Sequence, residues 1–560
     1  MPPCPCGFQL DGGQTQRPSR ASDRGGAAVV LGGQESWPRG EGRQRDRQRD
    51  WWGGDAPLNN SAPSWPSLVE AEQRVLDHQR KLHRWARADP DRRFGDVFNL
   101  ICDQATLLVA WERVAGNQGA RTAGVDAVTR RNVEQDIGVL PFVEELRSAL
   151  KDGTFAALPV RQVSIPKRNG KIRLLGIPTL RDRVAQMALK LILEPVFEVD
   201  FYPSSYGYRP GRRAQDAIAE IHQLTSRSYE WVVEGDITAC FDNVDHQILM
   251  GLVEERVADR RVLRLVRAFL RAGIVERHGG LAASLTGTPQ GGVASPLLAN
   301  IYLSVLDRHF AGIWERQMSP PWRRQQRRRR GQPNYRLIRY ADDFVVLVHG
   351  DRSDAEAIRT GIGEMLAEQL KMTLSVEKTH ITHIDDGFVF LGFRIQRWRR
   401  GNGRRVVLTI PSKDALARVM RKIKEATGAS TTSLRIGQVL RKVNPVLRGW
   451  AAYFRYGASK KTFSYLGWYA WWRMVYWIRR KHPHMTWKQT RRRYYGADRI
   501  REDGLVLYNP AKTRVERYRF RGTQIATPYN IDEVNPAGAR FRRTSHDDMA
   551  FIGQVSELVS

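Results

Sequence analysis

The sequence has few cysteines and no long apolar segment. Only four of its 560 residues are cysteine, which is too few for a disulfide framework and suits a reducing cytoplasm. A membrane-spanning helix needs about 18 consecutive apolar residues, and the chain has no such run. The apolar stretch over 27–31 is too short for the core of a signal peptide. These absences predict a globular, cytoplasmic protein with no membrane partner.

Acidic residues are scarce relative to basic ones. Asp and Glu number 59 against 90 Lys and Arg, so the formal net charge is +31. Such an excess indicates a polyanionic partner, nucleic acid before anionic membrane. The excess is uneven, because residues 1–60 contribute +1, residues 61–410 contribute +11 and residues 411–560 contribute +19. The last part alone is basic throughout, so it is the predicted binding region.

Three parts of the chain differ in pattern. Residues 1–66 are rich in Gly, Pro, Gln and Arg and lack apolar periodicity, which is typical of a disordered tail. Residues 67–410 mix short apolar strands with helical segments, which predicts an α+β fold. From residue 411 onward the pattern is mainly helical and rich in aromatics. Three aromatic residues there share one helical face and are expected to pack inward: Trp468, Trp472 and Tyr476.

Carboxylates lie at the ends of apolar strands. Asp342 and Asp343 form the tip of a predicted hairpin, and Asp236 ends another apolar run. Carboxylates between strands are costly unless they bind a cation, and hard oxygen ligands suit Mg²⁺; the alternative is a plain surface turn. Two Mg²⁺ ions need carboxylates from separate segments. We therefore expect Asp236 to meet Asp342 if their strands lie side by side.

Three further segments suit a nucleotide or a nucleic acid. A glycine-rich loop over 287–296 lets the backbone approach a nucleotide closely, although such loops also simply begin helices. A basic hairpin tip over 165–173 suits a triphosphate, and is otherwise a solvated turn. The arginine tract over 323–330 is expected to form a flexible loop that touches RNA without reading its sequence.

The order of these motifs resembles that of reverse transcriptases, and more narrowly that of proteins encoded by bacterial group II introns. The resemblance covers about residues 67–535. The segments with the polymerase motifs are Ile165–Lys167, Asp236–Phe241, Pro289–Gly291, Tyr340–Asp343, Glu377–Thr379 and Phe390–Phe393. The segments similar to the intron-encoded family are Gly176–Val184, Ser205–Gly211 and the maturase-like Leu447–Tyr456.

The resemblance implies a right-hand polymerase with fingers and palm over 67–410, a thumb and maturase domain over 411–485, and a DNA-binding-like region over 486–560. It implies an RNA-directed DNA polymerase that uses two Mg²⁺ ions and dNTP substrates. It also implies that the protein binds its host group II intron RNA, promotes splicing, and copies the intron into target DNA during retrohoming. A cytoplasmic, nucleoid-associated ribonucleoprotein is expected, and a homodimer is left open.

The same resemblance implies roles for single residues. Asp236 and Asp342 would bind both metals, Asp343 would support them, and the Ile237 carbonyl would be a further ligand. Phe241 would exclude a ribose 2′-hydroxyl, the alternative being a core aromatic. The other implied nucleotide contacts are Lys167, Arg173 (with Lys171 as an alternative), Gln290, and Lys378, which is either a proton donor to pyrophosphate or a solvated lysine. The predicted RNA contacts are Arg448, Trp450, Arg455, Lys460 and Lys461.

The absence of later cysteines narrows the expected activities. No cysteine follows Cys240, so the zinc-stabilised nuclease that often ends such proteins is not expected. Priming would then use an existing 3′ end, such as a nascent strand at a replication fork. Two other functions remain open: a stand-alone cellular reverse transcriptase, for example in phage defence, and a splicing factor without polymerase activity. Removing the chain beyond residue 410 is expected to weaken RNA binding and its salt dependence.

Overall fold

The computed structural model describes residues 65–530 apart from six short segments, 167–171, 276–279, 283–285, 289–290, 497–498 and 523–524. Contacts within the chain separate Met1–Ser64 from a compact unit that begins at Trp65, and only the latter is described below. The tail predicted over 1–66 therefore lies almost entirely outside the described residues.

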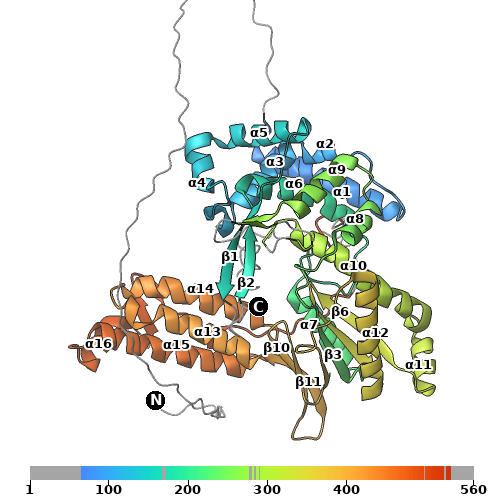
Figure 1. Cartoon of the computed structure of the whole chain (residues 1–560). Helices are drawn as coiled ribbons and strands as arrows, with labels where there is room; N and C mark the ends of the chain where they lie inside the picture. The colour runs from blue at the N-terminus through green and yellow to red at the C-terminus, as the bar shows by residue number, and fades with distance from the viewer. Residues whose placement is uncertain are drawn as a thin grey trace, which may run out of the picture. The chain divides into compact units, whose positions relative to one another are not determined.

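Helices form the N-terminal part of this unit (Figure 1). The first of them begins with a capping box, in which Ser67 and Glu70 each satisfy a backbone N–H of the other. The sixth is buried along nearly its whole length and contacts both the first and the third. The bounds are α1 Leu68–Ala88, α2 Phe98–Ile101, α3 Gln104–Ala115, α4 Arg130–Asn132, α5 Val139–Lys151 and α6 Leu180–Phe197.

A hairpin of two longer strands projects from these helices (Figure 1). It comprises β1 (Val160–Pro166) and β2 (Ile172–Ile177), which pair antiparallel. Two short strands, β4 (Ile274–Val275) and β5 (Leu281–Ala282), extend the sheet in the order β2-β1-β4-β5. The pairing of β1 with β2 confirms the hairpin predicted over 165–173, whose tip, residues 167–171, lies outside the described residues.

The central sheet has four antiparallel strands in the order β6-β7-β3-β8. Its bounds are β3 Trp231–Asp236, β6 Asn334–Tyr340, β7 Asp343–His349 and β8 His380–His383. Successive side chains along each strand point to opposite faces of the sheet, so they enter two different cores. Val233 and Val346 pack with α10 and α12 in one core, whereas Val232 and Leu347 pack with α7 and the C-terminal helices in the other. The predicted α+β class is confirmed.

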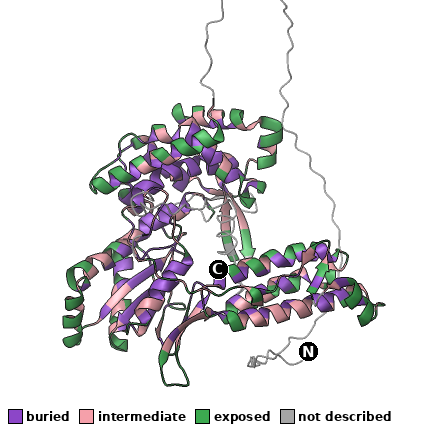
Figure 2. Cartoon of the chain, turned by 180° about the vertical axis from the view of Figure 1, so that it is seen from behind, coloured by how far each residue is buried: buried purple, intermediate pink, exposed green. Residues whose placement is uncertain are grey.

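Helices surround this sheet, and Figure 2 shows buried residues concentrated between them and the strands. One segment differs from expectation, because the arginine tract predicted as a flexible loop forms helix α11. The bounds are α7 Ala214–Thr225, α8 His246–Glu254, α9 Arg260–Arg271, α10 Ser295–Ile313, α11 Pro321–Arg329 and α12 Arg352–Leu370.

The C-terminal part begins with a small sheet and continues as helices, as the sequence predicts. The sheet has the order β11-β10-β9. Three short strands then follow the last helix, where mainly helical structure was expected. The bounds are β9 Phe388–Phe390, β10 Phe393–Arg399, β11 Arg405–Pro411, α13 Lys413–Ala426, α14 Ile436–Phe454, α15 Lys460–Lys481, α16 Trp487–Tyr494, β12 Tyr495–Gly496, β13 Arg499–Glu502 and β14 Leu505–Val506.

The second core joins the central sheet to the C-terminal helices. Phe393 of β10 packs against Phe454 of α14, with ring centroids 4.8 Å apart. Gln215 of α7 donates a hydrogen bond to the Tyr453 carbonyl (3.1 Å). The inward face of α15 differs from the predicted one: Phe463, Leu466, Ala470, Met474 and Trp477 are fully buried. Trp468, Trp472 and Tyr476 are only half-buried.

None of the helices in the described ranges combines the length and the apolar character that crossing a bilayer requires.

Candidate active site

The acidic residues of the two separate motifs meet on adjacent strands. Strands β3 and β7 pair antiparallel with Asp236 directly opposite Asp343, and Asp342 lies in the turn just before β7. The condition on which the sequence-based expectation depended, that these two strands lie side by side, is therefore met. The three carboxylates share one end of the central sheet, although Asp236 precedes Asp342 and Asp343 by about a hundred residues in the sequence.

The turn before β7 is held in an unusual backbone conformation. Ala341 has φ +58°, a left-handed value that a non-glycine residue adopts only when its surroundings enforce it. The Gly207 Cα lies against the Ala341 backbone so closely that any Cβ there would overlap it. The glycine of the Ser205–Gly211 motif is therefore required by close approach to the carboxylate turn.

A buried arginine reaches the same turn from β6. Arg339 is fully buried and forms a two-pronged ion pair with Asp307 of α10 (2.9 and 2.5 Å). Its Nη1 also donates to the Ala341 carbonyl (2.8 Å) and to Asn300 Oδ1 (3.0 Å). Asn300 in turn donates to the Gly207 carbonyl (2.9 Å). This network fixes both sides of the turn that positions Asp342.

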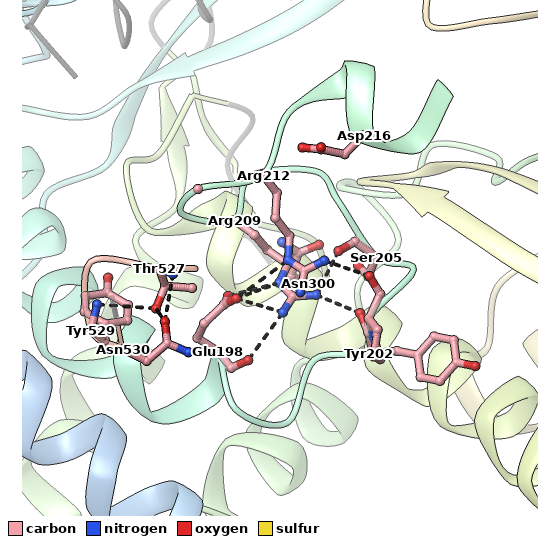
Figure 3. A network of polar contacts seen from close by, with 12 residues as sticks. Glu198, Tyr202, Ser205, Arg209, Arg212, Asp216, Asn300, Thr527, Tyr529 and Asn530 are labelled. Atoms are coloured by element: carbon pink, nitrogen blue, oxygen red, sulfur yellow. Dashed lines mark hydrogen bonds and ion pairs between the residues drawn. The ribbon is translucent and has the colours of Figure 1, made fainter. Parts of the chain in front are cut away.

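The loop beneath the turn has its own polar support, shown in Figure 3. The Arg209 guanidinium pairs with the Glu198 carboxylate (2.7 Å) and donates to the carbonyls of Tyr202 (2.7 Å) and Ser205 (2.8 Å). The Tyr206 N–H donates to the Arg339 carbonyl (2.8 Å), which attaches the loop to β6. The Ser205–Gly211 motif therefore acts as a scaffold for the carboxylate turn.

Desolvation and like charges together set the electrostatics of the carboxylate cluster. Asp343 is accessible to solvent, yet the surrounding protein partly desolvates its carboxyl and, with the charges of Asp342 and Asp236, raises its pKa to about 7. The Lys378 ammonium lies 2.8 Å from Asp236 Oδ2, and this hydrogen bond raises the pKa of Lys378. Lys378 therefore lies at the carboxylate cluster and is protonated, and its role toward pyrophosphate stays a prediction.

The fit of a divalent cation can be tested on this donor set. Within the described ranges, no group of three His, Cys, Asp or Glu side chains already has the arrangement of a metal site. Desolvation, and after it repulsion by Asp342 and Asp236, raises the Asp343 pKa, and a bound cation would offset both effects. No hydrogen bond between described backbone groups ends on the Ile237 carbonyl, which leaves it available as a ligand. The residues present fit a divalent cation.

The glycine-rich loop packs against the turn that follows β3. Gly287 has φ +87°, and its Cα faces the backbone of Phe241 and Asp242. The Thr288 N–H donates to the Phe241 carbonyl (2.7 Å). Phe241 itself is half-buried, so it is not a pure core aromatic. Further along, Gly291 has φ +119° and contacts Gly176 of β2.

The remaining predicted nucleotide contacts are described only in part. Lys167, the alternative Lys171, and Gln290 lie outside the described residues. Arg173 pairs with Ile165 in the β1–β2 ladder, and only its backbone is described. Their contacts with a nucleotide remain predictions.

The predicted RNA contacts fall into two groups. Trp450 is 2% exposed and packs on Phe454 and Phe463, so its ring cannot stack on RNA while this core is intact. The basic residues lie nearer the surface: Arg448 is exposed above the Tyr508 ring, Arg455 pairs with Glu516, Lys460 donates to the Ala511 carbonyl (2.6 Å), and Lys461 is exposed.

Sequence reasoning missed the buried network around Arg339. A signal for it was present, because Arg339 is a charged residue inside the apolar strand that precedes the carboxylates. A charge in such a strand must be paired to be buried. The partners Asp307 and Asn300 lie on α10 beyond the residues of the glycine-rich motif over 287–296, so the sequence did not indicate the pairing itself.

This fold and site define a class of protein. Carboxylates from two separate segments that meet at one end of a sheet are the ligands that a two-metal site of the kind found in polymerases needs. Comparison with protein families agrees: residues 165–395 match the reverse transcriptase (RNA-dependent DNA polymerase) family, and residues 416–495 match the group II intron maturase-specific domain.

Relatives of known sequence place the chain more narrowly. Protein YkfC of Escherichia coli is 39% identical over 362 residues, which cover 61% of this chain and 93% of YkfC. The group II intron-encoded protein LtrA of Lactococcus lactis is 33% identical over 359 residues, 56% of this chain and 59% of LtrA. Nuclear intron maturase 1, mitochondrial, of Arabidopsis thaliana is 28% identical over 293 residues, which cover 39% of this chain and 41% of the maturase. The chain belongs to the family of group II intron reverse transcriptases and maturases.

Proposed function

We propose that this chain copies RNA into DNA at the Asp236–Asp342–Asp343 cluster, with two Mg²⁺ ions and dNTPs. The observation that supports this most strongly is the register of β3 and β7, which sets Asp236 opposite Asp343 with Asp342 in the adjoining turn. Mg²⁺ bound by these carboxylates and the Ile237 carbonyl would activate a primer 3′-hydroxyl and stabilise the leaving pyrophosphate.

The chain's own residues account for the rest of the reaction. Arg339 holds the Ala341 carbonyl and thereby the direction of the Asp342 side chain. Lys378 is protonated at its hydrogen bond with Asp236 and is the proposed proton donor to pyrophosphate. Phe241 is proposed to block the ribose 2′-hydroxyl. Lys167, Arg173 and Gln290 are proposed to hold the triphosphate and the base.

Primer extension on poly(rA)/oligo(dT) tests the polymerase assignment. Wild type should extend the primer with Mg²⁺ and stop when EDTA removes it. Asp342→Ala should lower the rate at least about a thousandfold, because a ligand shared by both ions is lost. Asp386→Ala, which changes an exposed aspartate of the loop between β8 and β9, is the matched control. Equal extension by wild type and Asp342→Ala would refute the assignment.

The maturase domain over residues 416–495 supports a second activity on RNA. We propose that the C-terminal basic region binds the host group II intron RNA, promotes its splicing, and remains bound while the polymerase copies it into target DNA. In this proposal residues 67–410 act as fingers and palm, 411–485 as thumb and maturase domain, and 486–560 as the DNA-binding part. Splicing assays with and without the protein test it.

Two other functions give different results. A stand-alone reverse transcriptase would extend primers but leave the splicing rate of the intron RNA unchanged. A splicing factor without polymerase activity would accelerate splicing equally well with Asp342→Ala and would not extend primers. The nucleotide sequence on both sides of the gene also discriminates, because an intron RNA fold around the reading frame supports the main proposal.

A further inference from the structure

Helix α11 (Pro321–Arg329) is a helix that apolar packing does not hold. None of its residues is buried, and its one large apolar side chain, Trp322, is 60% exposed. Surface helices ordinarily dock through an apolar stripe. The stability of α11 must therefore have another source.

Three arginines fasten α11 to the protein. Arg323 donates to the Arg316 carbonyl (2.6 Å), and Arg324 donates to the carbonyls of Met318 (2.5 Å) and Ser319 (2.7 Å). Arg327 donates twice to the Pro333 carbonyl (3.2 and 2.8 Å). These three residues form the half-buried face of the helix. Arg323 also lies over one face of the Trp322 ring (5.3 Å) and Arg324 over the Trp314 ring (5.2 Å). Carbonyls and rings are neutral partners, so they do not balance the positive charge of these side chains.

No carboxylate balances this charge. Between Glu315 and Asp342 the chain contains nine arginines and no acidic residue. Among the ion pairs of the described residues, none involves an arginine from Arg323 to Arg330. Like charges four residues apart on a helix repel each other, although cations at a helix C-terminus are partly favoured by its dipole. An external anion would relieve this repulsion.

The outer face of α11 combines three kinds of group. Four exposed residues recur at helical spacing and share one face of the helix: Trp322, Gln325, Gln326 and Arg329. Arg328 and Arg330, both exposed, flank them. An exposed aromatic ring, side-chain amides and arginines are the groups that bind RNA, by stacking on unpaired bases and by contacts with phosphates. We call this set the α11 face.

The α11 face lies away from the catalytic turn. Helix α11 contacts β6 at its beginning, where Asn334 donates to the Arg324 carbonyl (3.0 Å). The catalytic turn follows the other end of β6, about 20 Å away along a strand of this length. In Figure 1, α11 lies beyond α12 on the side opposite to helices α13–α15. A ligand on the α11 face is therefore distinct from the nucleotide at the carboxylates.

We propose that the α11 face binds structured RNA, with Arg328, Arg329 and Arg330 on the phosphate backbone and Trp322 stacked on an unpaired base. The proposal rests on the proposed function, because an RNA that is both bound and copied needs attachment away from the polymerase site. This second attachment would hold a folded RNA without reading its sequence.

The test measures binding of the full chain to a fluorescent RNA hairpin with a loop of several unpaired bases, at a series of salt concentrations. Arg328→Gln/Arg329→Gln/Arg330→Gln removes three phosphate contacts and should weaken binding about tenfold at low salt and make the salt slope shallower by about 2. Trp322→Ala should weaken binding to the hairpin several-fold and leave a blunt RNA duplex unaffected.

Matched variants separate this effect from net charge and from misfolding. Arg260→Gln/Arg264→Gln/Arg271→Gln removes three exposed charges from α9 and should change binding much less. Replacement of Arg328, Arg329 and Arg330 by lysine should retain the salt slope. All these variants should extend primers on poly(rA)/oligo(dT) at the wild-type rate.

Several results would overturn the proposal. One is that the variant with Arg328, Arg329 and Arg330 replaced by glutamine binds the RNA hairpin as tightly as wild type. Another is that the α9 control variant loses as much affinity for the hairpin as that variant does. Equal losses with a DNA hairpin of the same sequence would overturn the assignment to RNA. Wild type that extends primers but does not bind the RNA hairpin at all would refute the intron-binding part of the proposed function, and this inference with it.

Discussion

Arg339 is a positioning residue, because its buried guanidinium links Asp307 to the backbone of the catalytic turn. Removing one member of a buried ion pair leaves an uncompensated charge, at a cost of about 3–5 kcal/mol, whereas replacing both by apolar residues is often close to neutral. Asp307→Leu should therefore lower the free energy of unfolding by about 3 kcal/mol.

The double variant Asp307→Leu/Arg339→Met should recover much of that stability but not the primer-extension rate, because the Ala341 carbonyl and Asn300 lose their donor. Thermal unfolding and kcat are measured on the same samples. A double variant that regains both stability and kcat would mean that Arg339 only stabilises the fold.

Phe241 is half-buried in the turn that follows β3, and the Thr288 N–H donates a hydrogen bond to its carbonyl (2.7 Å). If its ring excludes the ribose 2′-hydroxyl, Phe241→Ala should lower the preference for dGTP over GTP by at least about tenfold, since the selection is steric. Ratios of kcat/KM on poly(rC)/oligo(dG) measure this, and Phe241→Tyr is the control that keeps the ring. An unchanged preference in Phe241→Ala would make Phe241 a packing residue.

At the scale of elements, Asp216 attaches the extended C-terminal segment to α7. This buried carboxylate accepts hydrogen bonds from Tyr518 (2.7 Å) and Arg521 (2.8 and 2.6 Å), and from the Arg213 N–H at the start of α7 (2.8 Å). Asp216→Asn removes the charge of a buried, hydrogen-bonded pair and should lower the free energy of unfolding by about 2 kcal/mol.

Limited proteolysis provides a second measurement, since the segment after Arg514 should be cleaved earlier in Asp216→Asn than in wild type. The exposed Arg517 supplies the control Arg517→Gln, which should leave both stability and cleavage unchanged. Identical cleavage of Asp216→Asn and wild type would mean that other contacts, such as Tyr529 with Glu194 (2.9 Å), hold the segment alone.

At the scale of the whole molecule, the central sheet and the C-terminal helices share a core. Val232 and Leu347 of the sheet pack in the same cluster as Val439, Trp450 and residues of α15. A fragment that ends at residue 410 keeps all three carboxylates but exposes this apolar face to water, which costs about 25 cal/mol per Å². We expect it to bind the dye ANS and to lose primer extension.

This expectation changes how the RNA-binding region is tested. Deletion removes half of a core as well as a charged surface, so a weakened RNA complex would not identify its cause. Substitution of the exposed Arg448 and Lys461 by glutamine leaves the core intact and should reduce the salt slope of intron RNA binding by about 1–2. A 65–410 fragment that folds and extends primers at the wild-type rate would contradict the shared-core argument.

The sequence predicted those features that depend on local pattern and side-chain chemistry. Apolar runs that end in Asp236 and Asp342 predicted two strands whose carboxylates meet if the strands are adjacent, and the order of motifs indicated the polymerase family. The same local reasoning misassigned the arginine tract, because its helix is held by hydrogen bonds from its arginines to the carbonyls of Arg316, Met318, Ser319 and Pro333 in the flanking segments, and not by an apolar stripe. It also placed Trp450 on an RNA surface, although the ring is in the core.

What the sequence by itself determined is the chemistry of this protein: three carboxylates in the right order, and a net charge of +31 concentrated toward the C-terminus. Only the tertiary structure decided which polar groups are buried together, such as Arg339 with Asp307, and which aromatic rings water can reach. The physical reason is that periodicity reports the face of one element, whereas burial and pairing depend on partners brought together by long-range packing.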